Sequence, residues 1–405
     1  PRVRRQRQMC IRDSIQNAKV SISSKGEPER VLEQLTTDSS GQTENISLPA
    51  PPEEYSLEPG IYQPYSEYDV LVEAEGFKPL NISGTEILAG TQAIQPAALT
   101  GDEGGTPPED PVVIPDHTLF GNYPPKIAEA EVKPVHESGE IVLSRVVVPQ
   151  TIVVHDGAPT DSTAKDYYVP YRDYIKNVAS SEIYATWPES TITANILAIM
   201  SFTLNRVYTE WYRNKGYDFT ITSSTAYDHK WIYGRNIFDS ISRIVDEIFD
   251  QYLARPGVKQ PILTQYCDGK RVTCPNWMSQ WGSKMLGDQG YSPIEIIRNY
   301  YGSSMYVNTA DQISGIPSSW PGYNLTIGSS GDKVRQMQEQ LNRIAEVYTA
   351  IPVIAADGIF GNDTRNAVTE FQNIFGLPKT GIVDFKTWYK ISQIYVGITR
   401  MAELN

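Results

Sequence analysis

The chain has few cysteines, few histidines and no long apolar run. Among its 405 residues there are 3 cysteines and 4 histidines, which leaves little material for a metal centre built from these side chains. A membrane-spanning helix needs about 20 consecutive apolar residues, and the sequence contains no such run. Lys and Arg number 35 against 48 Asp and Glu, so the formal net charge is -13. We therefore expect no membrane span and no nucleic acid partner, because phosphate binding favours a basic surface.

The three cysteines are Cys10, Cys267 and Cys274. The last two can form a local disulfide, remain free thiols or supply two ligands of a metal site. Two cysteines make a weak pattern for zinc when the nearest histidine in sequence is His229, far upstream. We therefore expect a disulfide or free thiols at Cys267 and Cys274, with no metal site and no cofactor.

The length suggests two to four domains, at about 150 residues for each domain. Hydrophobic residues make up 40% of the chain, which supports ordinary globular cores. No secretory signal is visible, because the basic residues within 1–14 are not followed by an apolar stretch. This segment is unlike the rest of the chain and lacks an initiating Met, so we expect a truncated or spliced N-terminus.

Residues 357–388 are the most informative stretch of the sequence. Gly358 and Gly361 allow a tight turn, and a segment with an apolar helical face follows them. A break at Gly381 precedes a last short helix that contains Thr387 and Trp388. Upstream, residues 332–348 carry apolar side chains at helical spacing. The pattern predicts three helices joined by tight turns.

The same stretch resembles the repeat of the small three-helix peptidoglycan-binding domains. Their pattern is D-G-x-F-G-x-x-T, then A-V-x-x-F-Q, then G-L-x-x-T-G-x-x-D-x-x-T-W, and order and spacing agree throughout. The resemblance implies a peptidoglycan-binding domain over residues 322–400, with peptidoglycan as partner. The pattern residues that we assign to this wall-binding domain are Asp357, Phe360, Thr364, Phe371, Gln372 and Trp388. The alternative is a helical domain that has lost its ligand.

Short alternating strands separated by Gly and Pro turns indicate a small β-sandwich over residues 15–100. The pattern T-x-D-x-x-G-x-T, followed by Y-x-V-x-V-x-A-x-G-F, resembles the carboxypeptidase-regulatory, transthyretin-like module. Such modules are generally scaffolds, so we assign no chemistry here. Residues 101–139 are rich in Pro, Gly and acidic side chains and predict a linker.

A carboxylate on the inner face of a helix is the first candidate for chemistry. Glu182 lies four residues after Val178 and three after Ala179, on the apolar face of a helix that begins near Pro170. Desolvation raises the pKa of such a group, and a glutamate with a raised pKa suits the role of general acid in a glycosidase-like reaction. The alternative is that Glu182 lies in water at a frayed helix end.

The surrounding residues resemble the SpoIID/LytB catalytic domain. Residues 173–182 follow its pattern D-Y-[VL]-x-x-V-[VA]-x-x-E, and Trp187, Pro188 and a long helix come next. Residues 278–282 and 290–302 parallel its ending, G-[ML]-S-Q-Y-G, G-x-x-Y and I-L-x-x-Y-Y-x-G. The resemblance implies a catalytic domain over residues 140–310, with Glu182 as its catalytic residue.

Four residues near these motifs are candidates for substrate binding. Tyr184 and Trp187 can stack on sugar rings, with core packing as the alternative. Ser279 and Gln280 can hydrogen-bond acetamido groups or hold their loop in place, and an amide both donates and accepts. Between the motifs the family often has a histidine, a serine and paired glycines, whereas this chain has residues 264–274 with two cysteines. No zinc site is carried over.

The whole layout resembles the clostridial spore cortex-lytic enzymes of the SleC type, so we expect an α+β protein of several domains. Members of that group resemble lytic transglycosylases acting on spore cortex during germination, made as proenzymes that a subtilisin-like protease activates. The β domain over 15–100 is then a pro-region, and Arg145 and Val146 are the candidate processing site. The expected location is the spore cortex and coat or the extracellular cell wall.

For such an enzyme Glu182 protonates the glycosidic oxygen and then takes the proton of the C6 hydroxyl of muramic acid, which leaves a 1,6-anhydro end. A hydrolase needs a second carboxylate, for which Asp173, Glu189 and Asp228 are nominal candidates. Two other functions stay open: a non-catalytic cell-wall or spore-coat binding protein, and an N-acetylmuramidase.

Overall fold

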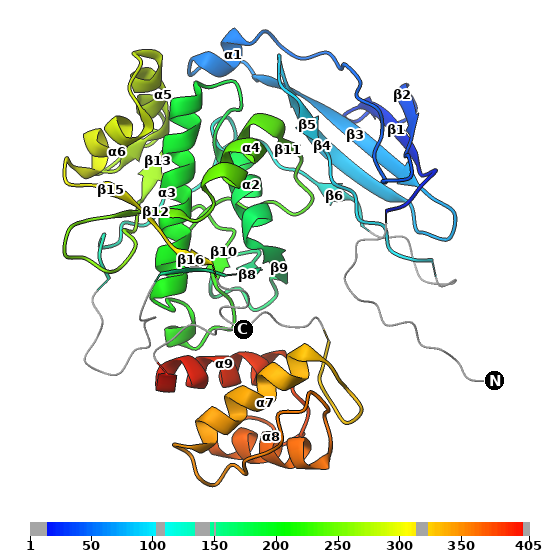
Figure 1. Cartoon of the computed structure of the whole chain (residues 1–405). Helices are drawn as coiled ribbons and strands as arrows, with labels where there is room; N and C mark the ends of the chain where they lie inside the picture. Colours follow the sequence, from blue (N-terminus) through cyan, green and yellow to red (C-terminus); the bar gives the residue numbers. More distant parts are fainter. Residues whose placement is uncertain (1–13, 103–109, 134–145, 150, 313–322, 400–405) are drawn as a thin grey trace. The chain divides into compact units, whose positions relative to one another are not determined.

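The computed structural model describes two compact units (Figure 1). The first comprises residues up to Gly121 together with Ile232–Ser240, and the second comprises Asn122–Trp231 with the chain from Ile241 onward. No helix among the described residues is long and apolar enough to cross a membrane. The described residues are 14–102, 110–133, 146–149, 151–312 and 323–399.

The first unit is built on a five-stranded sheet in the order β2-β1-β3-β4-β6. The neighbours are antiparallel except for β4 and β6, which run parallel. One face buries alternate apolar side chains, and Ile114 and Ile232 complete that core. The elements are β1 (Lys19–Ser24), β2 (Val31–Thr36), α1 (Glu54–Leu57), β3 (Tyr65–Glu73), β4 (Leu80–Leu88) and β6 (Val112–Val113).

The first unit differs from the β-sandwich that we expected over residues 15–100. Its long strands share one sheet, and β5 (Ala93–Ile94) pairs instead with β11 (Ile237–Phe238). A buried ion pair fixes this later segment, since Arg235 contacts both carboxylate oxygens of Glu86 at 2.8 and 2.6 Å. Alternation of apolar and polar residues shows only that one face of a sheet is buried. It does not show whether a second sheet or irregular chain covers that face, so the sequence could not distinguish a sandwich from a single sheet.

Helix α3 (Glu189–Tyr208) is the central helix of the part of the second unit that precedes the C-terminal helices (Figure 1). It is buried along most of its length and contacts α2, α5, α6 and β12. A three-stranded sheet has the order β10-β8-β9, in which β8 and β9 precede α3 in the sequence and β10 follows it. The remaining elements are β7 (Val147–Val148), β8 (Thr151–His155), β9 (Asp166–Pro170), α2 (Tyr171–Glu182), η1 (Arg213–Lys215), β10 (Ile221–Thr222), α4 (Asp239–Ile248), β12 (Gln251–Ala254), β13 (Tyr266–Cys267), β14 (Met278–Ser279), α5 (Gln280–Asp288), α6 (Pro293–Tyr301), β15 (Tyr306–Thr309) and β16 (Asp311–Gln312).

Residues 122–133, which we predicted to lie in a linker, fold with the second unit. The amide of Ile127 donates to the carbonyl of Ala226 at 2.7 Å. The side chain of Gln260 exchanges two hydrogen bonds with the main chain of Lys133, at 3.2 and 2.9 Å. Composition indicated an exposed segment, but these main-chain groups find partners from more than 90 residues away. We call residues 122–133 the docked segment.

The described C-terminal part contains three helices, as the sequence predicted: α7 (Asp332–Ala345), α8 (Asn362–Ile374) and α9 (Phe385–Thr399). The last one has 15 residues and is longer than the short helix that we expected. Their inner faces bury Met337, Leu341, Val368 and Phe371 among others. Leu325 pairs with Val383 in an isolated bridge that joins the chain entering this part to the turn before α9.

Two glutamines hold the two turns of this part in the same way. The amide nitrogen of Gln338 donates to Ile359 O at 3.0 Å and Thr364 Oγ1 at 3.1 Å, and its oxygen accepts from Gly358 N at 2.8 Å. Gln372 does the same with Ile382 O at 2.9 Å, Thr387 Oγ1 at 3.1 Å and Gly381 N at 2.9 Å. Both glycines have a positive φ, of 77° and 66°. The turns share the sequence Gly-Ile-x-x-x-x-Thr, so the domain repeats one local structure.

Candidate functional site

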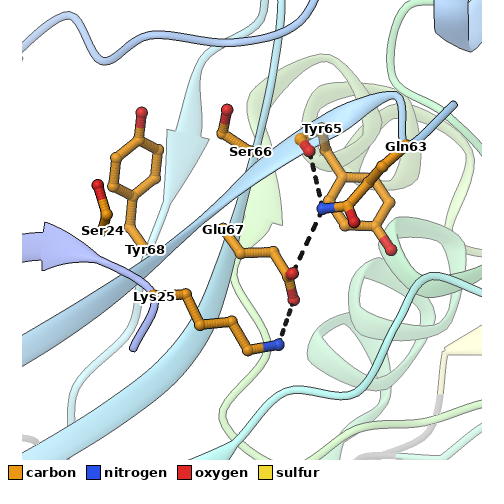
Figure 2. Close-up of a pocket in the computed structure, with 7 residues that line it drawn as sticks. All are labelled: Ser24, Lys25, Gln63, Tyr65, Ser66, Glu67 and Tyr68. Atoms are coloured by element: carbon orange, nitrogen blue, oxygen red, sulfur yellow. Dashed lines mark hydrogen bonds and ion pairs between the residues drawn. The ribbon is translucent and has the colours of Figure 1, made fainter. Parts of the chain in front are cut away.

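The first unit has a pocket lined by polar side chains (Figure 2). Lys25 forms an ion pair with Glu67 at 2.6 Å, and the amide of Gln63 donates to the carbonyl of Tyr65 at 2.9 Å. These contacts pair the polar groups with one another, and the pocket has no buried acid. The lining residues are Ser24, Lys25, Gln63, Tyr65, Ser66, Glu67 and Tyr68. The chemistry predicted from the sequence lies in the second unit instead.

Glu182 is the last residue of α2 and is 3% exposed. Pro170 precedes the helix, and its buried face carries Tyr171, Tyr174 and Val178, as the helical spacing predicted. The chain becomes extended at Ile183, directly after the carboxylate. Glu182 therefore lies inside the protein at a well-formed helix end, and the alternative of a solvated, frayed end does not describe this structure.

Both carboxylate oxygens of Glu182 accept a hydrogen bond. Oε1 accepts the main-chain N–H of Lys230 at 2.6 Å, and Oε2 accepts the hydroxyl of Tyr266. Burial raises the pKa of Glu182, while the nearby ammonium group of Lys126 and the two hydrogen bonds act in the opposite direction. The result is a buried carboxyl group that keeps its proton to higher pH than an exposed glutamate does.

Tyr266 belongs to a buried aromatic cluster beside the acid. Its ring stacks on His229, with centroids 5.9 Å apart and an interplanar angle of 14°. The His229 Nδ1 atom lies 3.1 Å from the hydroxyl of Tyr174. Burial lowers the pKa of His229 well below its usual value, so the ring is neutral. Burial, reinforced by the charge of Glu182, raises the pKa of Tyr266, which keeps its hydroxyl protonated as a donor.

None of the three nominal candidates for a second carboxylate forms a described contact with Glu182. Asp228 is fully buried, and its oxygens accept from Arg206 Nε at 2.6 Å and from the Tyr212 hydroxyl at 2.6 Å. Glu189 is exposed and forms an ion pair with Arg243. Asp173 is exposed on α2. Asp228 therefore holds the buried network of Arg206 together and is not a free second carboxylate.

Tyr184 and Trp187 are 2% and 3% exposed. They pack against each other with ring centroids 5.9 Å apart, and Trp187 lies 5.0 Å from Trp281. Because so little of each ring is exposed, neither ring presents a face to a sugar in this structure. The structure therefore places these two residues in the core, which was the alternative to substrate stacking.

Ser279 and Gln280 support the site from the start of α5. The Ser279 hydroxyl accepts the main-chain N–H of Gly282 at 2.9 Å and caps the helix. The amide of Gln280, which is 4% exposed, donates to the main-chain carbonyl of Glu182 at 2.9 Å. Both side chains hold the structure together, and Gln280 does so at the acid itself.

A disulfide joins Cys267 to Cys274, with their Cα atoms 5.7 Å apart. Cys267 belongs to β13, which pairs in parallel with β14. We call residues 266–280 the holder loop, because its two ends, Tyr266 and Gln280, both contact Glu182. In the described part of the chain, no group of three His, Cys, Asp or Glu side chains could hold a metal ion.

The six pattern residues of the C-terminal part build its fold. Phe360, Phe371 and Trp388 are at most 1% exposed. Asp357 accepts the N–H of Ile359 at 2.8 Å and so fixes the first turn. Thr364 and Gln372 belong to the two turns described above. Five of the six are buried, so Asp357 is the one pattern residue whose side chain is exposed to a ligand.

The candidate processing site is only partly described. Arg145 lies outside the described residues. Val146 is 7% exposed, and the next two residues form β7, which pairs with β16.

Three partners of the acid were not found from the sequence: Lys126, Lys230 and Tyr266. Lys230 acts through its main chain, which any residue can supply, and Tyr266 lies 84 residues from Glu182 in the stretch where the family pattern fails. Lys126 lay inside the predicted linker. No local pattern marks any of the three, because their contact with Glu182 exists only in the folded chain.

Comparison with known proteins assigns the C-terminal part to a described domain family. Residues 330–391 match the family described as "Putative peptidoglycan binding domain". A stretch of 76 residues is 41% identical to the zinc D-Ala-D-Ala carboxypeptidase of Streptomyces albus G, and covers 19% of this chain and 28% of that protein. The crystal structure of the SleB N-terminal domain matches at 30% identity over 18% of this chain and 93% of that chain. Its TM-score of 0.16 is too low to carry a structural argument. This chain is therefore a mixed α+β protein of more than one domain, with a helical peptidoglycan-binding domain at its C-terminal end.

Proposed function

We propose that this protein is a lytic transglycosylase that cleaves the glycan strands of spore cortex peptidoglycan during germination, with Glu182 as its general acid and base. The observation that carries the proposal is the buried carboxyl group of Glu182, whose pKa burial raises and whose two oxygens are held by donors. The peptidoglycan-binding domain in the same chain supports peptidoglycan as the substrate. The resemblance of residues 173–182 and 278–302 to the SpoIID/LytB domain supports the reaction.

In the first step, Glu182 gives its proton to the oxygen between N-acetylmuramic acid and N-acetylglucosamine. The bond from C1 to that oxygen breaks, and its electron pair stays with the leaving oxygen. In the second step, the ionised Glu182 takes the proton of the muramic C6 hydroxyl while O6 bonds to C1. The acid is restored and the product carries a 1,6-anhydro end, so no water is consumed.

The position of Asp228 favours this reaction over hydrolysis. An inverting hydrolase needs a second free carboxylate to activate water, and a retaining one needs it as nucleophile. Asp228, the nominal partner with the most buried position, is held by Arg206 and Tyr212. A single acid is sufficient for the transglycosylase.

The full chain is further proposed to be a proenzyme, and the docked segment supports this idea. A glycan cannot reach an acid that is 3% exposed, so something must uncover it. Lys126 of the docked segment lies near enough for its charge to act on Glu182, and the ring of Tyr266 lies 5.2 Å from its Nζ atom. Cleavage between Arg145 and Val146 by a subtilisin-like protease would separate this segment from the catalytic chain.

Mass spectrometry of digested cortex tests the reaction. Anhydro-muramic ends are the expected product, and reducing muramic ends would instead assign an N-acetylmuramidase. Unchanged cortex after protease treatment would favour the non-catalytic wall or coat protein. Such a protein belongs to the spore cortex and coat region or to the cell wall in either case.

Lysis of decoated spores by the full chain and by a chain that begins at Val146 tests the proenzyme idea. Gln260→Ala in the full chain is a second test, because it removes the two hydrogen bonds to Lys133 and loosens the docked segment. We expect the uncut variant to gain activity while the cut form is unchanged. Equal lysis by the full and the shortened chain would reject the proenzyme idea.

A further inference from the structure

One side chain holds the carboxyl group of Glu182 through a hydrogen bond in the described structure, and that side chain is Tyr266. The other bond comes from the main chain of Lys230 and survives any substitution there except proline. A carboxylate oxygen has about two lone-pair sites. Tyr266 and Lys230 therefore occupy one site on each oxygen and leave another for a proton that enters or leaves.

We propose that Tyr266 is the positioning residue of the acid, which keeps the carboxyl group of Glu182 aimed in both its protonated and its ionised form. The proposal rests on the proposed function, since Glu182 must both give and take a proton there. Tyr266 keeps its own proton throughout: its O–H donates to Oε2, and the proton that moves is the one exchanged between Glu182 and the sugar. It touches neither the glycosidic bond nor the C6 hydroxyl in this scheme.

The surroundings of Tyr266 fix the direction of its hydroxyl. The residue is 4% exposed, and its ring stacks on His229. The carbonyl of the preceding residue, Gln265, accepts the hydroxyl of Tyr301 at 2.7 Å. The following residue, Cys267, is tied to Cys274 by the disulfide. Ring packing, a main-chain hydrogen bond and a covalent bond thus restrain this tyrosine.

The same holder loop also fixes the main chain of the acid. Its far end, Gln280, donates to the carbonyl of Glu182 at 2.9 Å, while Tyr266 holds the carboxyl group. The pairing of β13 with β14 brings these two ends side by side. The holder loop therefore contacts both the side chain and the main chain of Glu182. This arrangement is expected for a carboxyl group whose orientation must stay fixed.

The test is Tyr266→Phe, which keeps the ring and removes the hydroxyl. The ionised form of Glu182 then loses a donor, so the pKa of Glu182 rises further and the high-pH limb of the activity profile moves to higher pH. A hydrogen bond to a charged group is strong enough that kcat should fall by about tenfold or more, with KM nearly unchanged. Tyr68→Phe is the matched control, because it also removes one buried tyrosine hydroxyl, which donates to the carbonyl of Pro49 at 2.5 Å in the first unit, whereas Glu182 and the holder loop belong to the second unit.

Titration of the carboxyl carbon of Glu182 by NMR in the full chain gives a readout that does not depend on catalysis. Glutamate labelled with ¹³C supplies the signal, and its loss in Glu182→Gln assigns it. A higher pKa in Tyr266→Phe but not in Tyr68→Phe supports the proposal. Equal pKa values in wild type and Tyr266→Phe would overturn it, even if the protein cleaves cortex. Absence of cleavage by the wild type would instead reject the proposed function and leave the NMR result to decide the role of Tyr266.

Discussion

Glu182→Gln removes the acidic proton of the proposed site and almost nothing else. The amide has the shape of the carboxyl group, so its oxygen can still accept from Lys230, and its nitrogen can donate to the Tyr266 hydroxyl in place of the bond that Oε2 accepted. We therefore expect the variant to fold normally. Because general acid catalysis contributes about 10²–10⁴ in rate, we expect loss of cortex lysis on that scale.

The assay is the release of soluble fragments from decoated spores after identical protease treatment of each protein. Glu189→Gln is the matched control, since that side chain is 67% exposed and pairs with Arg243 at the surface. We expect the control to lyse cortex at the wild-type rate. Activity of Glu182→Gln within a few-fold of wild type would refute the assignment of Glu182.

We also expect the stability of Glu182→Gln, relative to wild type, to depend on pH. Burial raises the pKa of Glu182 above that of the unfolded chain, so the folded state binds this proton more tightly. Its contribution to stability is present at low pH and is lost as pH rises through the folded pKa. Glutamine has no such dependence. The melting temperature of Glu182→Gln, relative to wild type, should therefore be higher at pH 8 than at pH 4, and the opposite trend would contradict the burial argument.

Three further predictions concern the framework. Arg206→Met leaves the carboxylate of Asp228 buried without its partner and should cost about 3–5 kcal/mol in urea unfolding, whereas Arg243→Met at the surface should cost less than about 1 kcal/mol; equal costs would contradict the buried network. Removing residues 323–405 should abolish co-sedimentation with insoluble peptidoglycan, and unchanged binding would make the three helices structural only. Reduction of the Cys267–Cys274 disulfide, or its replacement by two serines, should lower stability by about 2 kcal/mol because the loop it closes is short, and unchanged melting would reject a stabilising role.

The C-terminal domain was predictable because its pattern is contiguous. Within residues 357–388 the sequence contains both the buried side chains, such as Phe371 and Trp388, and the glycines of the turns. Helical spacing alone placed Glu182 on the apolar face of α2 but left open whether the helix end is buried or frayed, and the structure buries it. Its chemical role stays a prediction.

The surroundings of the acid were not predictable, because they come from distant segments. Lys126, Lys230 and Tyr266 converge on Glu182 only in the folded chain. Composition also predicted a linker where residues 122–133 dock, because the partners of that segment, among them Gln260 and Gln265, lie far along the chain. Tyr184 and Trp187 were candidates for sugar binding on residue type alone, and in this structure both side chains are buried in the core.

The matching roles of Gln338 and Gln372 divide the residues of this domain into two groups. Some side chains hold the turns, whereas other, exposed side chains take no part in them. Each glutamine satisfies one turn from the inside, so both turns depend on a buried side chain as well as on exposed ones such as Asp357. Surface residues such as Ile327 and Ile359, which are 48% and 59% exposed, are then free to vary with the wall that the domain meets. Substitutions at such positions leave the two turns, and with them the way the helices are joined, as they are.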